Sequence, residues 1–376
     1  MAHADPTGST TPESITALLL DQADRLFGQH VTPKTLDEAD SGVWPAALWQ
    51  AVSEAGLPLA LVPDELGGVG LAPADAMLLV RRAAYHTVPL PLGEAMIASA
   101  LWAAASGEPP PGGVITFAAS PGPETVSLRR TPDGVRLDGR LDRVPWGTDA
   151  DHVLVHARDE AGRGHLALMP RSSEPKNRAR RNVAYEPRPN LLLDGLMLPA
   201  DAVREAQGAT SDGLLVFGAL LRSQGMVGAM ERGLDHALLY ANERSQFGRA
   251  IGKFQAVQHM LAEAAGHAAA ATAAADGAAE AWGRPDFRFA TALAKARTGE
   301  AAGRVAAVCH QVLGAMGITQ EHPLHHATRR LWSWRDEFGA DAWWEEEIGR
   351  LVCAGGGQAL WDTLVRVTQR SASAPT

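Results

Sequence analysis

Apolar residues recur at helical spacing through the N-terminal part of the chain. In 13–29 they fall on one helical face, at Ile15, Leu18, Leu19, Ala23 and Leu26. Pro45 stands near the start of a second predicted helix, and Gly56 follows its end. Further helices are predicted from Pro73 and over 91–107. No strand-like alternation interrupts this region, so we expect it to be helical.

The pattern changes after 108–113, where the sequence EPPPGG is typical of a hinge-like linker. Short segments rich in Val and Leu then alternate with turn residues: VITFAA, TVSLRRT, GVRLDGRL, HVLVHAR, GHLALMP and NLLLDGLML. Such a series predicts strands, and we expect a small antiparallel β domain. The basic segment 171–189 within it is predicted to be an exposed loop with solvated charges. The alternative is that some of its arginines contact a phosphorylated ligand.

The helical pattern returns after Pro199. Ser211 or Asp212 is suited to cap a long helix that runs to about Arg244. Further helical segments follow at 252–282, 286–313, 324–337 and 341–354. Helices of this length pack most readily as an antiparallel four-helix bundle. The fold class is therefore mainly α with a central β domain, with predicted domains at 1–112, 113–204 and 205–376.

Composition narrows the class of protein. The chain is 46% hydrophobic and 20% charged, which is typical of a globular protein. Its formal net charge of −9 argues against general nucleic-acid binding. Cys309 and Cys353 form no disulfide framework, and a reducing cytoplasm is the expected compartment. Residues 1–12 lack a signal-peptide pattern, and no stretch approaches the roughly 20 uncharged apolar residues of a membrane span.

Common catalytic motifs are absent from the sequence. There is no P-loop, no G-x-G-x-x-G after a predicted strand and no G-x-S-x-G. His322, His325 and His326 are close in sequence. Adjacent residues diverge on a helix, however, and no Cys or carboxylate stands at a ligand spacing. We therefore expect no metal site.

Two local patterns contain groups suited to a phosphorylated, aromatic ligand. The first is YANERSQFGRAIGKFQAVQ at 240–258, where Arg244 stands at a predicted helix C-terminus before a Gly-containing turn. Arginine pairs with phosphate as a bidentate fork, and phenylalanine stacks on flat rings. The second is QVLGAMG at 311–317, where glycines allow close backbone approach. In isolation, each pattern also fits an ordinary helix turn.

Together with the three-part layout, these patterns resemble the acyl-CoA dehydrogenase family. ERSQFGRAIGKFQAVQHMLA is close to the family's most recognisable signature, and QVLGAMGITQEHP is similar to its second one. LALVPDELGGVGL resembles the family's N-terminal glycine turn, and NLLLDGLMLPADAV resembles the strand that leaves its β domain. The resemblance spans nearly the whole chain.

The resemblance implies a helical domain, a β-barrel-like middle domain and a four-helix bundle. It implies an oligomeric, FAD-binding oxidoreductase of lipid metabolism that desaturates the Cα–Cβ bond of an acyl-CoA thioester. A carboxylate removes the α-proton in that reaction, and electrons pass to an electron-transferring flavoprotein. The family usually forms a dimer of dimers. Residues implied to contact FAD across a subunit boundary are Arg244, Gln246, Phe247, Gln311, Gly314 and Gly317.

The sequence departs from the family on the side that would line the flavin within one chain. TFAASPGPETV replaces the usual flavin-lining loop. Arg143 and Pro145 stand where the family has an aromatic residue and a threonine. Proline has no N–H to donate to the flavin edge. Trp146 is close by and is the candidate substitute as a ring contact.

The catalytic base is also missing from its usual place. Counting from Gly317 and Pro323, the family's glutamate position falls on Phe338. An alternative base position in the family falls near Gly218. Glu337 and Asp336 are the nearest candidates. Because one residue rotates a side chain by roughly 100° on a helix, either of them requires a rearranged turn.

Three interpretations follow from the resemblance. The chain is a catalytic dehydrogenase whose base is Glu337 or Asp336. Alternatively, it is one subunit of a bacterial heteromeric (α2β2) acyl-CoA dehydrogenase and completes the flavin site of its partner. The third interpretation is a flavin-free relative that acts as a scaffold or interaction partner. The sequence keeps the segments that act across the subunit boundary and has lost those that act within the chain, which favours the second.

Overall fold

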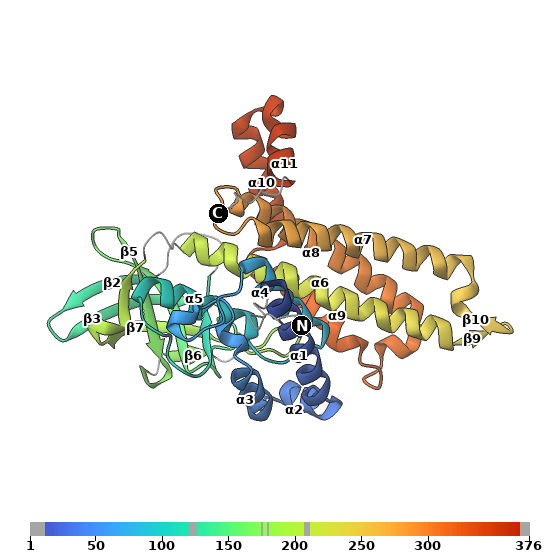
Figure 1. Cartoon of the computed structure of the whole chain (residues 1–376), viewed down its shortest axis with the longest axis horizontal. Coiled ribbons are helices and arrows are strands. Elements are labelled where there is room, and N and C mark those ends of the chain that lie inside the picture. The colour runs from blue at the N-terminus through green and yellow to red at the C-terminus, as the bar shows by residue number, and fades with distance from the viewer. Residues whose placement is uncertain (1–11, 120–125, 174–175, 179, 207–210, 369–376) are drawn as a thin grey trace, which may run out of the picture.

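A computed structural model describes residues 12–119, 126–173, 176–178, 180–206 and 211–368. Helices come first, a sheet follows, and a bundle of long helices completes the chain (Figure 1). The outer ends of the first and third predicted domains lie outside the described residues. So does 120–125, which is most of the segment predicted to replace the flavin-lining loop.

The N-terminal helices are α1 (Pro12–His30), α2 (Pro33–Ser41), α3 (Ala46–Glu54), α4 (Pro73–Tyr85) and α5 (Leu92–Ser106). Short 3-10 turns, η1 (Leu57–Leu59) and η2 (Asp64–Leu66), join α3 to α4. Helix α2 begins where sequence rules place it, because the Thr32 hydroxyl accepts a hydrogen bond from Thr35 N at 3.2 Å. Helix α5 is buried over most of its surface, since nearly all of its side chains are apolar or small.

The central strands are β1 (Ile115–Phe117), β2 (Val126–Thr131), β3 (Gly134–Leu141), β4 (His152–Arg158), β5 (Gly164–Pro170), β6 (Lys176–Arg178), β7 (Asn190–Leu198) and β8 (Val203–Glu205). They follow the order β6-β7-β3-β2-β4-β5-β8, and β1 also pairs with β4. The sheet was predicted to be antiparallel, and most of its strand pairs are, but β1 and β2 both pair with β4 in parallel. Asp151 aligns β1 with β4 by accepting a hydrogen bond from Val114 N at 2.8 Å. Strands β6 and β8 form the two edges of the described sheet and do not pair with each other, so the sheet is open and forms no closed barrel.

The bundle consists of α6 (Ser211–Glu243), α7 (Gln255–Glu280), α8 (Phe287–Leu313) and α9 (Leu324–Asp336). A small hairpin, β9 (Ser245–Gln246) and β10 (Arg249–Ala250), joins α6 to α7, and the turn η6 (Gly314–Ile318) follows α8. Two further helices, α10 (Asp341–Gly355) and α11 (Leu360–Thr368), project away from the body (Figure 1).

Two segments, Gly213–Glu243 and Phe287–Ile318, are long and apolar enough to cross a membrane by length and composition alone. Their apolar windows are 89% and 44% buried inside the protein, respectively. Both belong to helices of the bundle, and their hydrophobicity is that of core helices.

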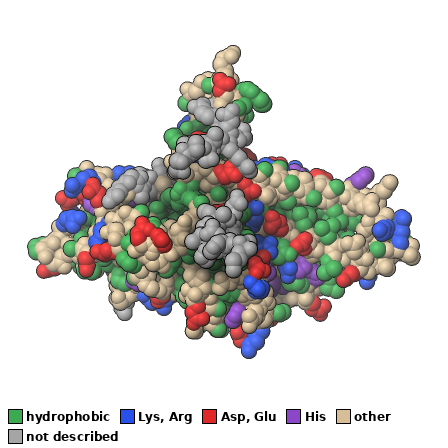
Figure 2. All heavy atoms as spheres, in the orientation of Figure 1, with side chains coloured by type: hydrophobic (Ala, Val, Ile, Leu, Met, Phe, Trp, Pro, Cys, Tyr) green, Lys and Arg blue, Asp and Glu red, His purple; other side chains and the backbone are tan. Residues whose placement is uncertain are grey.

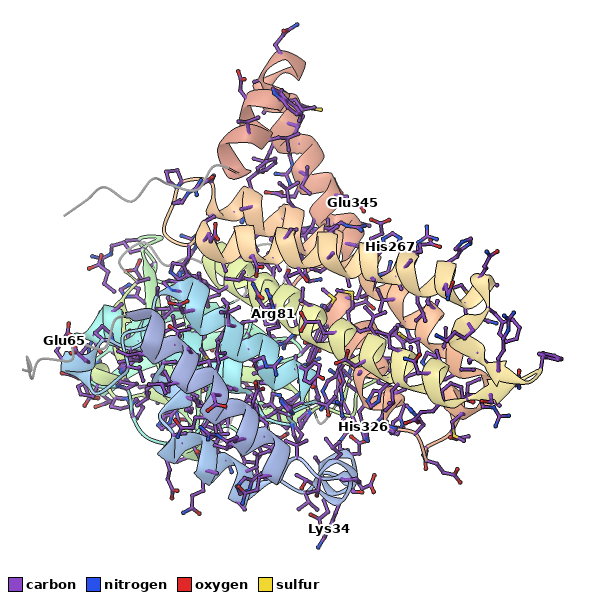
Figure 3. All side chains as sticks on the ribbon, turned by 45° about the vertical axis from the view of Figure 1, so that its right-hand side comes forward. Lys34, Glu65, Arg81, His267, His326 and Glu345 are labelled. Carbon is purple, nitrogen blue, oxygen red and sulfur yellow. The ribbon has the colours of Figure 1, made fainter. Side chains whose placement is uncertain are left out.

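One continuous apolar core joins the three parts. It includes Phe27 of α1, Phe117 of β1, Leu221 of α6 and Trp344 of α10. A buried guanidinium strengthens the connection: Arg81 of α4 donates to Gln224 Oε1 of α6 at 2.7 Å and pairs with Asp276 of α7 (Figure 3). The N-terminal helices therefore dock directly on the bundle.

Candidate active site

The turn after α9 is where the resemblance places the catalytic base. Phe338 has a φ of 53° and Gly339 a φ of 91°, so both adopt the left-handed conformation. A phenylalanine rarely adopts this conformation without support from its surroundings. Here the support is visible: Lys295 of α8 donates to Arg335 O at 2.7 Å and to Gly339 O at 2.8 Å, and Trp344 Nε1 donates to Phe338 O at 3.0 Å.

Phe338 and Gly218, the two base positions counted from the sequence, meet in space. A Cβ atom added to Gly218 would lie 2.1 Å from a ring carbon of Phe338. The ring is also 5.7 Å from that of Phe117 and 5.3 Å from the guanidinium carbon of Arg222. The place expected for a carboxylate is thus filled by hydrocarbon.

Glu337 points into a buried set of ionic groups. Arg188 Nε donates to its Oε1 at 2.7 Å, Arg222 Nε to its Oε2 at 2.7 Å, and Asn182 Nδ2 to its Oε1 at 2.9 Å. Desolvation raises the pKa of Glu337, but the charges of Arg188 and Arg222, together with these hydrogen bonds, lower the pKa to about 2. A carboxylate with so low a pKa is a weak base.

The ionic groups continue on both sides of Glu337. Arg222 Nη2 donates to Glu94 Oε1 at 2.6 Å, and Arg188 Nη2 donates to Glu186 Oε2 at 2.7 Å. Trp334 Nε1 also donates to Glu186, at 3.0 Å. We call this set the ion chain: Glu94, Arg222, Glu337, Arg188 and Glu186. It links α5, α6, the end of α9 and the loop before β7, all in the interior.

The ion chain corrects one prediction. Segment 171–189 was expected to be an exposed loop, and Arg180 and Arg181 are indeed exposed. Glu186 and Arg188, however, are 5% and 3% exposed. Their partners stand about 150 positions away in the chain, so no local pattern reveals their burial.

The turn predicted to contact the flavin edge is already fully bonded. Arg143 N donates to Asn190 Oδ1, Val144 N to Pro189 O and Trp146 N to Pro187 O, each at 2.9 Å. Thr116 Oγ1 donates to Pro145 O at 2.7 Å. Trp146 is 6% exposed, and its ring packs edge-on against Trp44 at 5.9 Å. The N–H groups of Arg143, Val144 and Trp146 are therefore already engaged within the protein.

The residues predicted to contact FAD across a subunit boundary lie at the end of the bundle opposite to Gly218 and Phe338. Arg244, Gln246 and Phe247 occupy the β9–β10 hairpin, and all three are exposed, Phe247 to 91%. Phe247 has a φ of 52°, followed by Gly248 at 80°, which aims the ring outward. Lys and Arg side chains are visible at this end in Figure 2. Arg249 of β10 and Lys253, which follows the hairpin, are both exposed.

Gln311, Gly314 and Gly317 share that end with the hairpin, because the up-down packing of the bundle places the C-termini of α6 and α8 together (Figure 1). His236 of α6 and His322 after η6 approach to 5.1 Å between ring centroids. Gln311 and Gly314 are exposed, whereas Gly317 is buried. At about 1.5 Å per residue, α6 separates Gly218 from Arg244 by roughly 39 Å.

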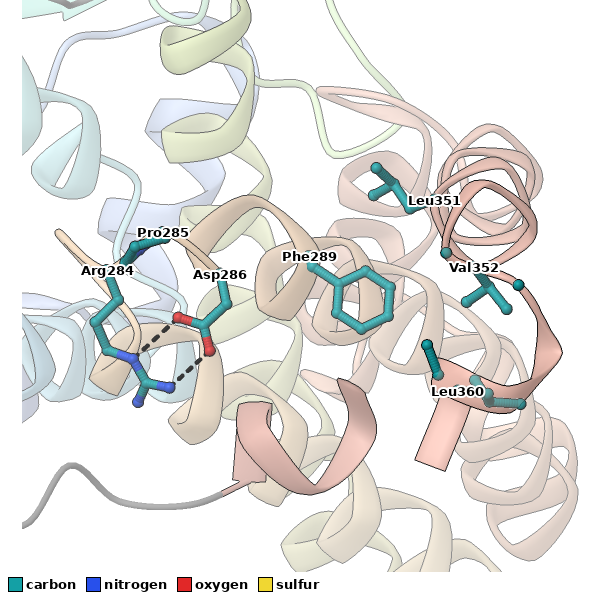
Figure 4. Close-up of a pocket in the computed structure, with 10 residues that line it drawn as sticks. Arg284, Pro285, Asp286, Phe289, Leu351, Val352 and Leu360 are labelled. Carbon is teal, nitrogen blue, oxygen red and sulfur yellow. Dashed lines mark hydrogen bonds and ion pairs between the residues drawn. The ribbon is translucent and has the colours of Figure 1, made fainter. Parts of the chain in front are cut away.

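Two cavities open near the bundle. One, of about 510 Å³, is mainly apolar and lies between the start of α8 and helices α10 and α11, with the Arg284–Asp286 ion pair at one end (Figure 4). The other, of about 750 Å³, is lined by Asp336 and Glu337 and by several arginines. The two predicted base candidates therefore share one cavity.

His325 and His326 of α9 lie close together, and Asp40, which the sequence analysis did not single out, lies beside them. Ligand atoms of Asp40, His325 and His326 lie within 4.8 Å of one another. Arg329 already pairs with Asp40 at 2.6 Å. Desolvation, then the charges of His325 and two arginines, lower the pKa of His326 to about 3 (Figure 3). A positive field of this kind opposes a cation, and the expectation of no metal site stays a prediction.

The site alone does not identify the class of protein, but two family models match this chain. The family model described as "Acyl-CoA dehydrogenase, N-terminal domain" matches residues 16–108. The family model described as "Acyl-CoA dehydrogenase, C-terminal domain" matches residues 210–350. This chain belongs to the acyl-CoA dehydrogenase family.

Named relatives agree with the family assignment. The acyl-CoA dehydrogenase IpdE2 of Mycobacterium tuberculosis is 29% identical over 325 residues, which cover 84% of this chain and 90% of that protein. The glutaryl-CoA dehydrogenase of Desulfococcus multivorans is 31% identical over 204 residues, about half of each chain. A chain of the ChsE4–ChsE5 complex from Mycobacterium tuberculosis has the same fold, with a TM-score of 0.82 and 24% identity over 93% of this chain and 99% of that one.

Proposed function

We propose that this chain is the flavin-site-completing subunit of a heteromeric acyl-CoA dehydrogenase, which desaturates an acyl-CoA thioester. The observation that carries the proposal is the packing of Phe338 on Gly218, the two positions at which the family places its base. A general base must lie within hydrogen-bond reach of the proton it removes. Glu337 is engaged by Arg188 and Arg222, so the base comes from the other chain.

The residues fit FAD on one side only. Around Trp146, the N–H groups are bonded to the segment before β7, so they do not fit the ring edge of a flavin. At the hairpin, Arg244 and Gln246 are exposed donors, and Gly314 allows close approach. These groups fit the phosphate-bearing part of a flavin whose ring is held by a partner. When bound, FAD supplies the hydride acceptor, and an electron-transferring flavoprotein then takes the electrons.

Relatives of the same fold support a two-chain assembly. The ChsE4–ChsE5 complex and the Tcur3481–Tcur3483 steroid acyl-CoA dehydrogenase each pair two differently named chains, and the second has a TM-score of 0.80 at 23% identity. We infer an α2β2 arrangement for this protein in the cytoplasm. The roughly 39 Å along α6 between Gly218 and Arg244 is consistent with an oligomer in which Arg244 contacts a flavin whose ring is held by another chain.

The test is to purify the chain alone and together with a co-expressed acyl-CoA dehydrogenase chain that has the family's glutamate. We expect no flavin absorbance and no turnover from the lone chain, and both from the mixed complex. Arg244→Ala in this chain should remove flavin from the complex. Arg130→Ala, at an exposed position of β2, is the matched control and should retain flavin.

Other outcomes of this experiment would support one of the two alternative interpretations of the sequence. If the lone chain holds flavin and turns over, and Glu337→Gln or Asp336→Asn abolishes turnover, the chain is an independent dehydrogenase. If no combination holds flavin, it is a scaffold of the family. Either result contradicts the proposal.

A further inference from the structure

A histidine caps the start of helix α9. Pro323 precedes the helix and, as a proline, has no N–H and no side-chain acceptor, so the first backbone donor of α9 is the N–H of Leu324. That N–H donates to Nδ1 of His322 at 3.1 Å. In return, His325 Nδ1 donates to His322 O at 2.9 Å. The two contacts have the reciprocal form of a capping box, with histidines in both side-chain positions.

This cap requires a neutral His322. A neutral imidazole has one nitrogen that accepts and one that donates, whereas an imidazolium has two donors. Because the N–H of Leu324 also donates, protonation of His322 at Nδ1 breaks the hydrogen bond. It also places a positive charge at the N-terminus of α9, where the helix dipole is positive. His325 differs, since its Nδ1 can donate in either charge state.

The groups around His322 disfavour its protonated form. The ring of His236 in α6 packs edge-on against it, with 5.1 Å between the ring centroids. Burial, then the charges of His325 and Arg232, lower the pKa of His322 below its usual value. Burial, Arg232 and His322 likewise lower the pKa of His236 to about 4, against the attraction of Asp235. The two rings therefore lie together as neutral imidazoles.

Two acidic side chains flank the rings, and neither forms an ion pair with His322 in the described structure. Asp235 of α6 accepts a hydrogen bond from the hydroxyl of Tyr85 at 2.6 Å. Glu321 is next to His322 in the chain and is exposed to solvent. Their charges are therefore shared with a phenol or with water.

Helix α9 adds positive neighbours on its own side. The rings of His325 and His326 lie 4.0 Å apart between centroids. Arg329 donates to His326 Nδ1 at 3.2 Å and pairs with Asp40 at 2.6 Å. The carboxylate of Asp40 is thus already neutralised by a guanidinium, and the first turn of α9 offers little attraction for a further proton.

Leu324 anchors the connection between α8 and α9 in the core of the bundle. Its side chain is 0% exposed. Gly317 of η6 lies against it, since a Cβ added to this glycine would stand 3.4 Å from Leu324 Cδ2. Most of the connection faces solvent, and Ile318 is 80% exposed. The hydrogen bond from Leu324 to His322 therefore ties an exposed connection to a buried anchor.

We propose that His322 is an acid-sensitive cap, which holds the connection 314–323 closed on α9 while it is neutral and releases it when it takes up a proton. The open connection binds more protons below a pH of about 6.5, the ordinary pKa of a histidine. Stability from the cap is therefore complete above that pH and is lost as pH falls toward the lowered pKa of His322. The proposal concerns the lone chain and does not depend on the proposed function.

The experiment measures amide hydrogen exchange of the full-length chain by mass spectrometry, from about pH 8 to about pH 5, with each rate divided by the intrinsic rate at that pH. Peptides that cover 314–326 should lose protection by up to about tenfold for each pH unit below about 6.5. Peptides from the middle of α7 should keep theirs. Unchanged protection of 314–326 across this range would overturn the proposal.

Three variants assign the effect to the imidazole. His322→Asn keeps an acceptor that does not titrate, so its protection should be high at every pH. His322→Ala has no acceptor, so its protection should be low at every pH. His259→Asn removes an exposed histidine of α7 and should retain the wild-type response. Loss of protection in acid by His322→Asn to the wild-type extent, or wild-type protection of His322→Ala at neutral pH, would show that the cap does not control the connection.

Discussion

The two ends of helix α6 differ in burial and in the groups that surround them. Near its start, Gly218 and Arg222 lie in an interior filled by Phe338 and by the ion chain. Just beyond its last turn, Arg244 and Phe247 stand in solvent. The resemblance to the family places the catalytic base at the interior end, yet Phe338 and the ion chain fill that end in this structure. The exposed end carries Arg244 and Phe247, the side chains that we propose contact a ligand held by another chain.

The largest expected effect tests whether the interior end is structural. Glu337→Gln leaves Arg188 and Arg222 buried with one carboxylate fewer, and removing one partner of a buried ion pair costs about 3–5 kcal/mol. We expect the free energy of unfolding, measured with urea, to fall by about that amount. Asp336→Asn, an exposed neighbour on the same cavity, is the control and should change little. A stable Glu337→Gln protein would mean that the ion chain does not hold this region together.

Lys295 provides the second test. Desolvation lowers its pKa to about 7 from an ordinary value of 10.5, despite the attraction of nearby acidic groups such as Asp341. Lys295→Met leaves the carbonyls of Arg335 and Gly339 without their donor, which should cost about 2–3 kcal/mol.

The same residue predicts a pH dependence. Between pH values of about 7 and 10.5 the unfolded chain binds more protons at Lys295 than the folded chain, so stability from this group rises with pH. The difference in unfolding free energy between wild type and Lys295→Met should therefore grow as pH rises through that window. A difference that is constant with pH would contradict a depressed lysine pKa.

A smaller effect is expected from Gly218→Ala. The added methyl group would overlap the Phe338 ring, and overpacking of a core costs typically about 1–3 kcal/mol. Gly266→Ala is the matched control, since nothing lies within 4 Å of its added Cβ in α7. That control should stabilise the protein by roughly 0.5–1 kcal/mol through helix propensity. Thermal unfolding of both variants measures the contrast, and equal shifts would show that Phe338 does not fill this space.

The smallest effect on stability should come from the exposed end. Phe247→Ala removes a side chain that is 91% exposed, and we expect the unfolding free energy of the lone chain to stay within about 0.5 kcal/mol. In the mixed complex, the same variant should release flavin more readily, measured as flavin retained after gel filtration. Unchanged retention would remove Phe247 from the proposed contact.

Much of the fold was predictable from the sequence. The long helix predicted from Ser211 to about Arg244 is observed as Ser211–Glu243, because its apolar periodicity is unbroken. Strands β2 to β5 and β7 likewise fall in the Val- and Leu-rich segments, whereas β6 lies in the segment 171–189 that was predicted to be a loop. The parallel entry of β1 was missed, because pairing direction depends on a contact with Asp151 across the sheet and not on local alternation.

The candidate site was predictable only in part. Counting along the chain identified Phe338 and Gly218 as separate positions, and the structure brings them into contact. The roles of Arg188, Arg222 and Lys295 were invisible, because each depends on partners that are far away in sequence. The sequence alone does not show whether an arginine lies in an exposed basic loop or in a buried ion pair.

The ion chain also has a consequence for the cooperativity of unfolding. Glu94, Arg222, Arg188 and Glu337 belong to segments that would otherwise open independently. Unfolding any one of these segments would leave a buried charge in the others without its partner. The free energy of partial unfolding should therefore be close to that of complete unfolding. The helical layer, the sheet and the bundle should therefore melt in one calorimetric transition, with equal calorimetric and van't Hoff enthalpies.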